Sequence, residues 1–187
     1  MKRYHDESPR MPQWDYSGNG FYFLTLVTTK RKSNLAWIEK DEGKVIITLK
    51  PFGQIVEKEW FRSFEIRDEL LCHEYVMMPN HIHALVQVVK WEEKEPKIIA
   101  RDPIAHYGRP MVRKPMSISS FMAGFKSAVN SRVDDYIDLK KLPIMKFNSK
   151  NHFFQANCYD WIVRDQKAYD QIRNYIRKNP EEWASRF

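Results

Sequence analysis

The sequence predicts an α+β domain of the ferredoxin-like (RRM-like) class: an antiparallel sheet, two helices on one face and a third helix on the other. Apolar residues change between strand and helix periods in the order β-α-β-β-α-β, once a short extra strand and a final helix are set aside. The final helix follows this pattern and carries tyrosines. A length of 187 residues with 43% hydrophobic residues suits a single domain spanning 1–187.

Strands are expected where aromatic and β-branched residues gather. The segments are 21–29, 44–50, 69–78, 81–89 and 151–164. Pro79 and Asn80 form a tight connection between two of these segments, which predicts a hairpin. The short segment 44–50 is the strand that lies outside the six-element pattern.

Three segments have the apolar spacing of amphipathic helices. The first, 51–64, begins with a proline, which is well placed in a first helical turn, and the second, 117–133, begins with a serine. The third, 166–179, follows Asp165 as N-cap and is expected to end at Pro180. Residues 1–19 are interpreted as an irregular arm and residues 90–116, which contain four prolines, as a long loop.

The composition favours a partner that carries negative charge. The net charge is +7 and the isoelectric point is near 9.3, which suits nucleic acid first and an acidic membrane surface second. The two cysteines are far apart, so they indicate neither a disulfide framework nor a zinc knuckle. No membrane-spanning apolar run and no signal-peptide core is evident, so the expected location is the cytoplasm.

Two histidines open the segment 81–89. His81 and His83 are two residues apart, so in a strand their side chains project from the same face. The alternate residues are all apolar and are expected to face the two core helices: Ile82, Ala84, Val86 and Val88. The histidines are therefore expected on the opposite face, where they either share a metal ion or are simply hydrogen-bonded. Two ligands alone are too few for a metal site.

The last helix can bring further polar groups to that face. Tyr175 and Asn179 lie on or beside the apolar stripe around Ile172, one turn apart. If the stripe packs on Leu85 and Val89, a phenol hydroxyl and an amide oxygen approach the two imidazoles. This constellation suits phosphoryl transfer on DNA, with a tyrosine nucleophile and a divalent ion that polarises the phosphate. The alternative is a core tyrosine followed by an Asn-Pro helix end.

Several motifs together resemble the single-tyrosine HUH transposases of bacteria, including the REP-associated tyrosine transposases and related insertion-sequence enzymes. These motifs are "MPNHIHALV", "GFKSAV" and "CYDWIVRDQKAYDQIRNYIRKNP", and "DYSGNGFYFLTLVT" and "FGQIVEKEWF" are also similar to segments of that family. The resemblance extends from about Asp15 to Trp183. It departs from the family pattern at Trp161, where a histidine is expected, and at Cys158.

The resemblance implies a role for each matched residue. His81 and His83 would hold Mg²⁺ or Mn²⁺ with Asn179 as the third ligand, and Tyr175 would form a 5′-phosphotyrosine link and release a 3′-OH. The implied partner is single-stranded DNA, often with an adjacent hairpin. The family contains dimers that share active sites as well as monomers. Tyr159 and Tyr169 are rival nucleophiles: Tyr169 lies six residues before Tyr175, too far round and along the helix to replace it easily, and Tyr159 is expected on a strand and lacks a matched motif.

Basic residues near these motifs are candidates for phosphate contacts. They are Lys30, Arg31, Lys126, Arg132, Arg164 and Arg173. Each is also compatible with an ordinary solvated surface charge. Two other functions remain open: a non-catalytic RRM-like nucleic-acid-binding module, and a zinc hydrolase in which Glu74 would act as the base.

Overall fold

The computed structural model describes residues 15–90, 116–148 and 150–186. Most of the predicted N-terminal arm and nearly all of the predicted loop at 90–116 lie outside the described residues. In the part of the chain that is described, every helix is too short or too polar to cross a membrane.

The centre of the fold is an antiparallel sheet of four strands, which confirms the predicted sheet. The strands are β1 (Gly20–Val27), β4 (Leu70–Met77), β5 (His81–Val88) and β6 (Tyr159–Val163). Their order across the sheet is β4-β5-β1-β6, and all neighbours are antiparallel. Strand β1 is thus central and pairs with the strand that carries the two histidines.

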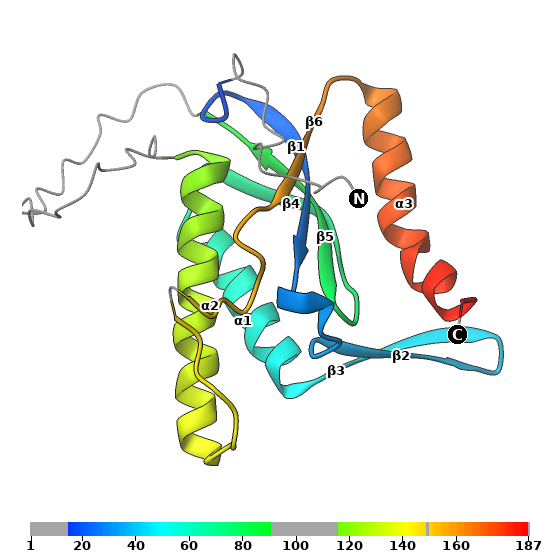
Figure 1. Cartoon of the computed structure of the whole chain (residues 1–187). Helices are drawn as coiled ribbons and strands as arrows, with labels where there is room; N and C mark the ends of the chain where they lie inside the picture. Colours follow the sequence, from blue (N-terminus) through cyan, green and yellow to red (C-terminus); the bar gives the residue numbers. More distant parts are fainter. Residues whose placement is uncertain (1–14, 91–115, 149, 187) are drawn as a thin grey trace, which may run out of the picture.

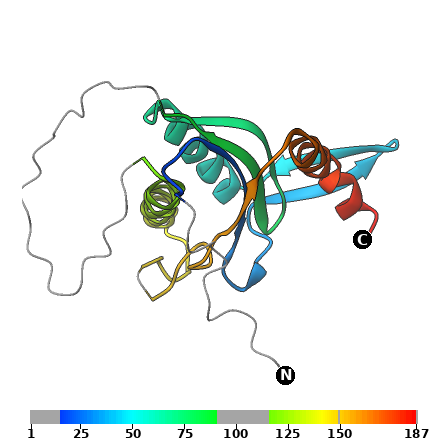
Figure 2. The ribbon, with the colours of Figure 1, turned by 90° about the horizontal axis from the view of Figure 1, so that it is seen from above.

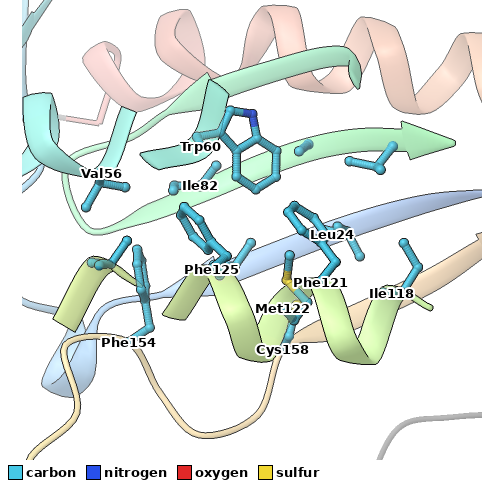
Figure 3. Packing of buried hydrophobic residues seen from close by; sticks show 14 of the residues in the cluster. Leu24, Val56, Trp60, Ile82, Ile118, Phe121, Met122, Phe125, Phe154 and Cys158 are labelled. Carbon is cyan, nitrogen blue, oxygen red and sulfur yellow. The ribbon is translucent and has the colours of Figure 1, made fainter. Parts of the chain in front are cut away.

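Helices cover both faces of this sheet (Figures 1 and 2). α1 (Pro51–Glu65) and α2 (Ile118–Lys140) lie on one face, and α3 (Gln166–Ala184) lies on the other. The main core fills the space between the sheet and the first two helices (Figure 3). There the Trp60 ring contacts Phe121 and Phe125 of α2, at centroid distances of 5.5 and 5.3 Å.

The alternation along β5 is as predicted. The four apolar residues Ile82, Ala84, Val86 and Val88 are fully buried in the main core. A second, smaller cluster lies on the other face, where Leu85 packs with Ile176 of α3. The two sides of one strand therefore serve two different cores, and the histidines lie on the α3 side.

A two-stranded hairpin precedes α1, where the sequence predicted one short strand. It consists of β2 (Ala36–Asp41) and β3 (Lys44–Leu49), joined by Glu42 and Gly43, which both have positive φ values as in a type I′ turn. β2 escaped prediction because its second half is charged and exposed. The hairpin contacts α3, and Ile38 packs against the smaller cluster.

The predicted strand 151–164 is largely wrong, because only residues 159–163 form β6. Phe153 and Phe154 lie in an irregular segment, but their side chains are buried in the main core. One isolated bridge, between Thr28 and Phe154, joins this segment to the end of β1. Buried loop residues and buried strand residues have the same composition, so the sequence pattern did not separate them.

Two helices are longer than predicted. α2 runs to Lys140 because Val133 and Ile137 continue its buried stripe. α3 passes through Pro180 and ends at Ala184, so the expectation that this proline ends the helix is wrong. Proline removes one backbone donor, but Pro180 is buried and the following turn brings Trp183 against the smaller cluster, which stabilises the extension.

Candidate active site

The two histidines of β5 lie side by side on the face of the sheet that α3 covers. Their ring centroids are 4.5 Å apart and their planes are inclined by 73°. His83 is only 7% exposed, and His81 is partly buried. The sequence prediction for this pair therefore holds for its position, and the remaining question is what the rings can bind.

Each imidazole is oriented through its Nδ1 atom. His81 Nδ1 lies 2.7 Å from Asn80 Oδ1, and His83 Nδ1 lies 2.8 Å from Thr25 Oγ1, which the register of β1 and β5 places beside it. An amide oxygen only accepts, so His81 Nδ1 donates and its Nε2 keeps a lone pair. Metal-binding histidines are commonly oriented in this way by a neighbour of the other ring nitrogen.

Tyr175 reaches the pair from α3 within the same chain. Its hydroxyl lies 3.3 Å from His83 Nε2, and the two ring centroids are 5.3 Å apart. Phe23 stacks on His83 at 5.2 Å and meets the Tyr175 ring edge-on at 5.9 Å. Tyr175 remains 43% exposed. A tyrosine that contacts the imidazole and is partly exposed can meet a molecule that enters from solvent.

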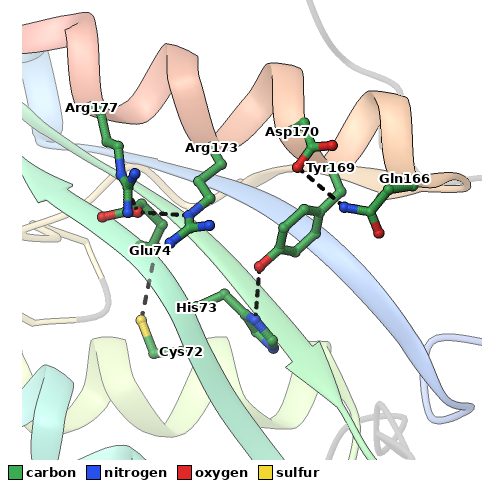
Figure 4. Close-up of polar contacts among 8 residues, drawn as sticks. All are labelled: Cys72, His73, Glu74, Gln166, Tyr169, Asp170, Arg173 and Arg177. Carbon is green, nitrogen blue, oxygen red and sulfur yellow. Dashed lines mark hydrogen bonds and ion pairs between the residues drawn. The ribbon is translucent and has the colours of Figure 1, made fainter.

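Two polar contacts hold α3 on the sheet (Figure 4). The Glu74 carboxylate of β4 accepts from Arg173 Nε at 3.3 Å and from Arg177 Nε at 2.6 Å. Because both arginines occupy this carboxylate, Glu74 is not placed to act as the base of a zinc hydrolase.

The second contact holds the other predicted tyrosine. His73 Nδ1 lies 3.0 Å from the Tyr169 hydroxyl, and His73 Nε2 donates to Gln87 Oε1 at 2.9 Å. Tyr169 is therefore engaged with a different histidine from the one that Tyr175 meets. The helix presents one tyrosine to each histidine-bearing strand.

Replacing Glu74 by glutamine is expected to loosen α3. The change removes the charge that both arginines share, and partly exposed ion pairs of this kind contribute about 0.2–1 kcal/mol each. Amide hydrogen exchange in α3 should accelerate roughly 3- to 10-fold, with little change in α2. Asp138→Asn, which removes the exposed ion pair with Lys146, is the matched control. Unchanged exchange in α3 would show that apolar packing alone holds the helix.

Asn179 lies one turn after Tyr175 on α3 and is 8% exposed. It is thus on the buried side of the helix, as the sequence predicted. The described residues contain no group of three or more His, Cys, Asp or Glu side chains that could hold a metal. The imidazoles of His81 and His83 and an amide oxygen are donor types that divalent ions accept, and the place of Asn179 in such a set stays a prediction.

Burial makes both imidazoles poor bases. It lowers the pKa of His81 to about 4, with the positive charge of Arg31 as a second cause. It also lowers the pKa of His83 to about 3, with the charge of His81 as a second cause. Both rings are neutral at pH 7, which is the state that ligates a metal.

These two pKa values predict how stability depends on pH. As the pH falls below about 6.5, the unfolded chain protonates both histidines while the folded chain does not, until about pH 4 and 3. The free energy of unfolding should therefore fall with a slope of up to about 1.4 kcal/mol per pH unit for each ring. Urea unfolding in EDTA at pH 7.5, 6.0 and 5.0 measures it. A His83→Gln variant should show a shallower slope, and equal slopes would contradict the assignment.

The predicted phosphate contacts divide into two groups. Arg31 lies close enough to His81 to lower its pKa, and exposed Lys30 is its neighbour. Arg164 precedes α3 and Arg173 lies within it, although Arg173 is paired with Glu74.

The other two basic residues lie on α2, in the helical layer on the far side of the sheet. Lys126 Nζ donates to the carbonyls of Gln155 and Ala156, and Arg132 pairs with Glu59 and Asp135. The structure therefore does not bring Lys126 and Arg132 to the histidine pair.

Four neighbours of the pair were not identified from the sequence: Phe23, Thr25, Asn80 and Trp183. Trp183 lies at the end of α3, with its ring 6.0 Å from that of His81. Asn80 precedes the histidines directly and could have been suspected as a hydrogen-bond partner. Phe23 and Thr25 depend on the pairing register of β1 and β5, which alternation within one strand does not reveal.

Comparison with known proteins places the fold. No family model matches the chain. A protein of Haemophilus influenzae, described as uncharacterized, is 25% identical over 180 residues, which cover 96% of this chain and 91% of that protein. The solved structure of a REP-associated tyrosine transposase bound to a REP hairpin superposes with a TM-score of 0.55 at 16% identity, covering 92% of this chain and 73% of that one. The chain therefore has a transposase-like fold.

Proposed function

We propose that this protein is a transposase-like endonuclease and strand transferase that acts on single-stranded DNA through Tyr175. The observation that carries the proposal is the 3.3 Å approach of the Tyr175 hydroxyl to His83 Nε2, beside His81. The likeness of the fold to a transposase whose solved structure contains a REP hairpin supports it. In this proposal the β1, α1, β4, β5, α2 and β6 elements form a ferredoxin-like unit of the single-tyrosine HUH type.

The proposed reaction exchanges one phosphate ester for another. Tyr175 Oη attacks a backbone phosphorus and loses its proton, and the bond from phosphorus to the 3′ oxygen breaks. That oxygen takes up a proton and leaves as a 3′-OH, while the 5′ phosphate stays on the tyrosine. The number of phosphate esters is conserved, so a second 3′-OH can reverse the step and join the strand elsewhere.

His81, His83 and Asn179 are proposed to hold Mg²⁺ or Mn²⁺. When bound, such an ion supplies Lewis-acid polarisation of the phosphate. The residues of this chain prepare the site: Asn80 and Thr25 orient the rings, and burial keeps the rings neutral. Arg31 is placed to attract the phosphate.

Other features of the proposal follow from the arrangement. The site is assembled within one chain, so a homodimer is compatible with the reaction but not required for Tyr175 to reach the histidines. The proposed partner is single-stranded DNA with an adjacent hairpin, and the proposed location is the cytoplasm. Lys30, Arg164 and Arg173 are proposed DNA contacts, whereas Lys126 and Arg132 are too engaged on the other face to be preferred.

Strand cleavage with labelled DNA tests this function. The DNA is single-stranded and carries the hairpins that flank the gene, with Mg²⁺, Mn²⁺ or EDTA present. A 3′ label should migrate with the denatured protein, and a 5′ label should leave as a shorter fragment. Binding without cleavage under all of these conditions would instead favour a non-catalytic RRM-like module, and cleavage without a covalent product would favour a metal-activated water.

A further inference from the structure

The strand at the β6 end of the sheet carries an exposed aromatic shelf on the face of the active site. Trp161 pairs with Phe23, and Tyr159 pairs with Thr25, so both side chains project to the same face as these partners. On the other side of β1, Thr25 pairs with His83. One row across the sheet therefore contains His83, Thr25 and Tyr159, and Trp161 stands in the next row.

This shelf is open to solvent. The Trp161 side chain is 70% exposed and Tyr159 is 39% exposed, whereas Phe23 between the shelf and α3 is partly buried. Large aromatic side chains are usually more buried than this. Two of them side by side on an end strand form a flat apolar surface on which an aromatic ligand can stack.

A cavity of about 610 Å³ lies beside the shelf and extends to two residues that contact His83. Its lining includes Phe23, Thr25, Tyr159, Trp161, Arg164 and Ala168. Phe23 and Thr25 also contact His83, so the two sites share a wall. From His83 to the shelf there are two strand spacings, which amount to about 10 Å.

The charged residues that line the cavity are Asp160, Arg164 and Asp165. Arg164 supplies a positive charge at its rim. Asp165 is the N-cap residue of α3, and its Oδ1 accepts a hydrogen bond from the Ala168 amide at 2.8 Å. Arg31 adds positive charge near His81. Arg164 and Arg31 thus supply one positive charge near the shelf and one near the histidine pair.

We propose that the shelf of Trp161 and Tyr159 binds unpaired nucleobases of single-stranded DNA beside the scissile phosphate by stacking. The proposal rests on the proposed function for the identity of the DNA. Base stacking on an aromatic side chain requires no sequence match, because every base has a π-face. The shelf thus holds the strand in place while Tyr175 reaches the phosphate.

Equilibrium binding separates stacking from phosphate contacts. The probe is fluorescently labelled (dT)₁₂, compared with a 12-mer of abasic residues of the same charge, and the protein carries Tyr175→Phe so that binding stays non-covalent. The preference for (dT)₁₂ should fall by roughly 5- to 150-fold in Trp161→Ala, and less in Trp161→Phe, which keeps an aromatic face. The salt dependence of binding should not change, because no phosphate contact is lost. Trp37→Ala, which removes a 49%-exposed tryptophan from the hairpin, is the matched control.

Three outcomes would contradict the proposal that the shelf binds nucleobases. They are an unchanged base preference in Trp161→Ala, an equal loss in Trp37→Ala, and equal affinity of the parent protein for both probes. None of these affects covalent cleavage by a protein with Tyr175 intact, so the proposed function is judged separately. Conversely, base-dependent binding that requires Trp161, without any cleavage, would support the shelf and contradict the nuclease.

Discussion

Tyr175→Phe is expected to abolish the covalent protein–DNA product and to lower strand cleavage by roughly 10⁴- to 10⁶-fold, as loss of a nucleophile does in other covalent enzymes. The hydroxyl is the group that meets His83 Nε2 at 3.3 Å, and phenylalanine removes it while keeping the ring. The ring contact with Phe23 is preserved, so the fold should not change. The measurement is the rate of formation of the denaturation-resistant product, with thermal unfolding as the test of integrity.

Tyr169→Phe and Tyr159→Phe are the matched controls. Tyr169 is hydrogen-bonded to His73, away from the histidine pair, and Tyr159 is on the β6 shelf. Tyr169→Phe should lower cleavage less than about tenfold, through a modest weakening of α3 docking. If Tyr175→Phe cleaved normally and one of the controls did not, the nucleophile would be misassigned.

His83→Ala is expected to have the next largest effect, a loss of roughly 10²- to 10⁴-fold in cleavage at saturating Mg²⁺ or Mn²⁺. The imidazole both faces the nucleophile and is the more buried member of the proposed metal pair. Because the alanine also leaves Thr25 Oγ1 without its ring partner, His83→Gln is tested beside it. Glutamine keeps a polar group of similar length but not the imidazole.

The metal dependence identifies the cause of that loss. If His83 is a ligand, the Mn²⁺ concentration that gives half of the maximal rate should rise in His83→Gln and in His81→Ala. His152→Ala is the control, because His152 contacts Thr29 through its backbone carbonyl, which the change keeps. This variant should leave the metal dependence unchanged. An activity loss with an unaltered metal curve would make His83 a partner of Tyr175 alone.

The sequence predicted which side of β5 carries the histidines and which side of α3 carries Tyr175 for the same reason. In both elements the apolar residues recur with a strong period. The alternation of Ile82 and Ala84 with His81 and His83 is one-sided, so only one orientation of β5 buries the apolar set. The stripe through Ile176 likewise decides which side of α3 meets the sheet. Both periodicities are local, and they are sufficient because each element has one apolar side.

The sequence did not predict features that depend on contacts between distant segments. Thr25 becomes a neighbour of His83 through strand register. Glu74, which the sequence offered as a catalytic base, instead pairs with two arginines about a hundred residues away. The extension of α3 through Pro180 reflects tertiary burial, which overrides the local tendency of proline to end a helix. In each case the missing information was the pairing between elements rather than the type of element.

The central claim is that Tyr175 is the residue that becomes linked to DNA, and peptide mapping tests it most directly. The covalent product is digested with nuclease and trypsin, and the tyrosine-containing peptides are analysed by mass spectrometry. The account predicts a nucleotide mass on the tryptic peptide of residues 174–177, "NYIR". A nucleotide on the peptide containing Tyr169 or Tyr159, or cleaved DNA with every tyrosine unmodified, would contradict the account.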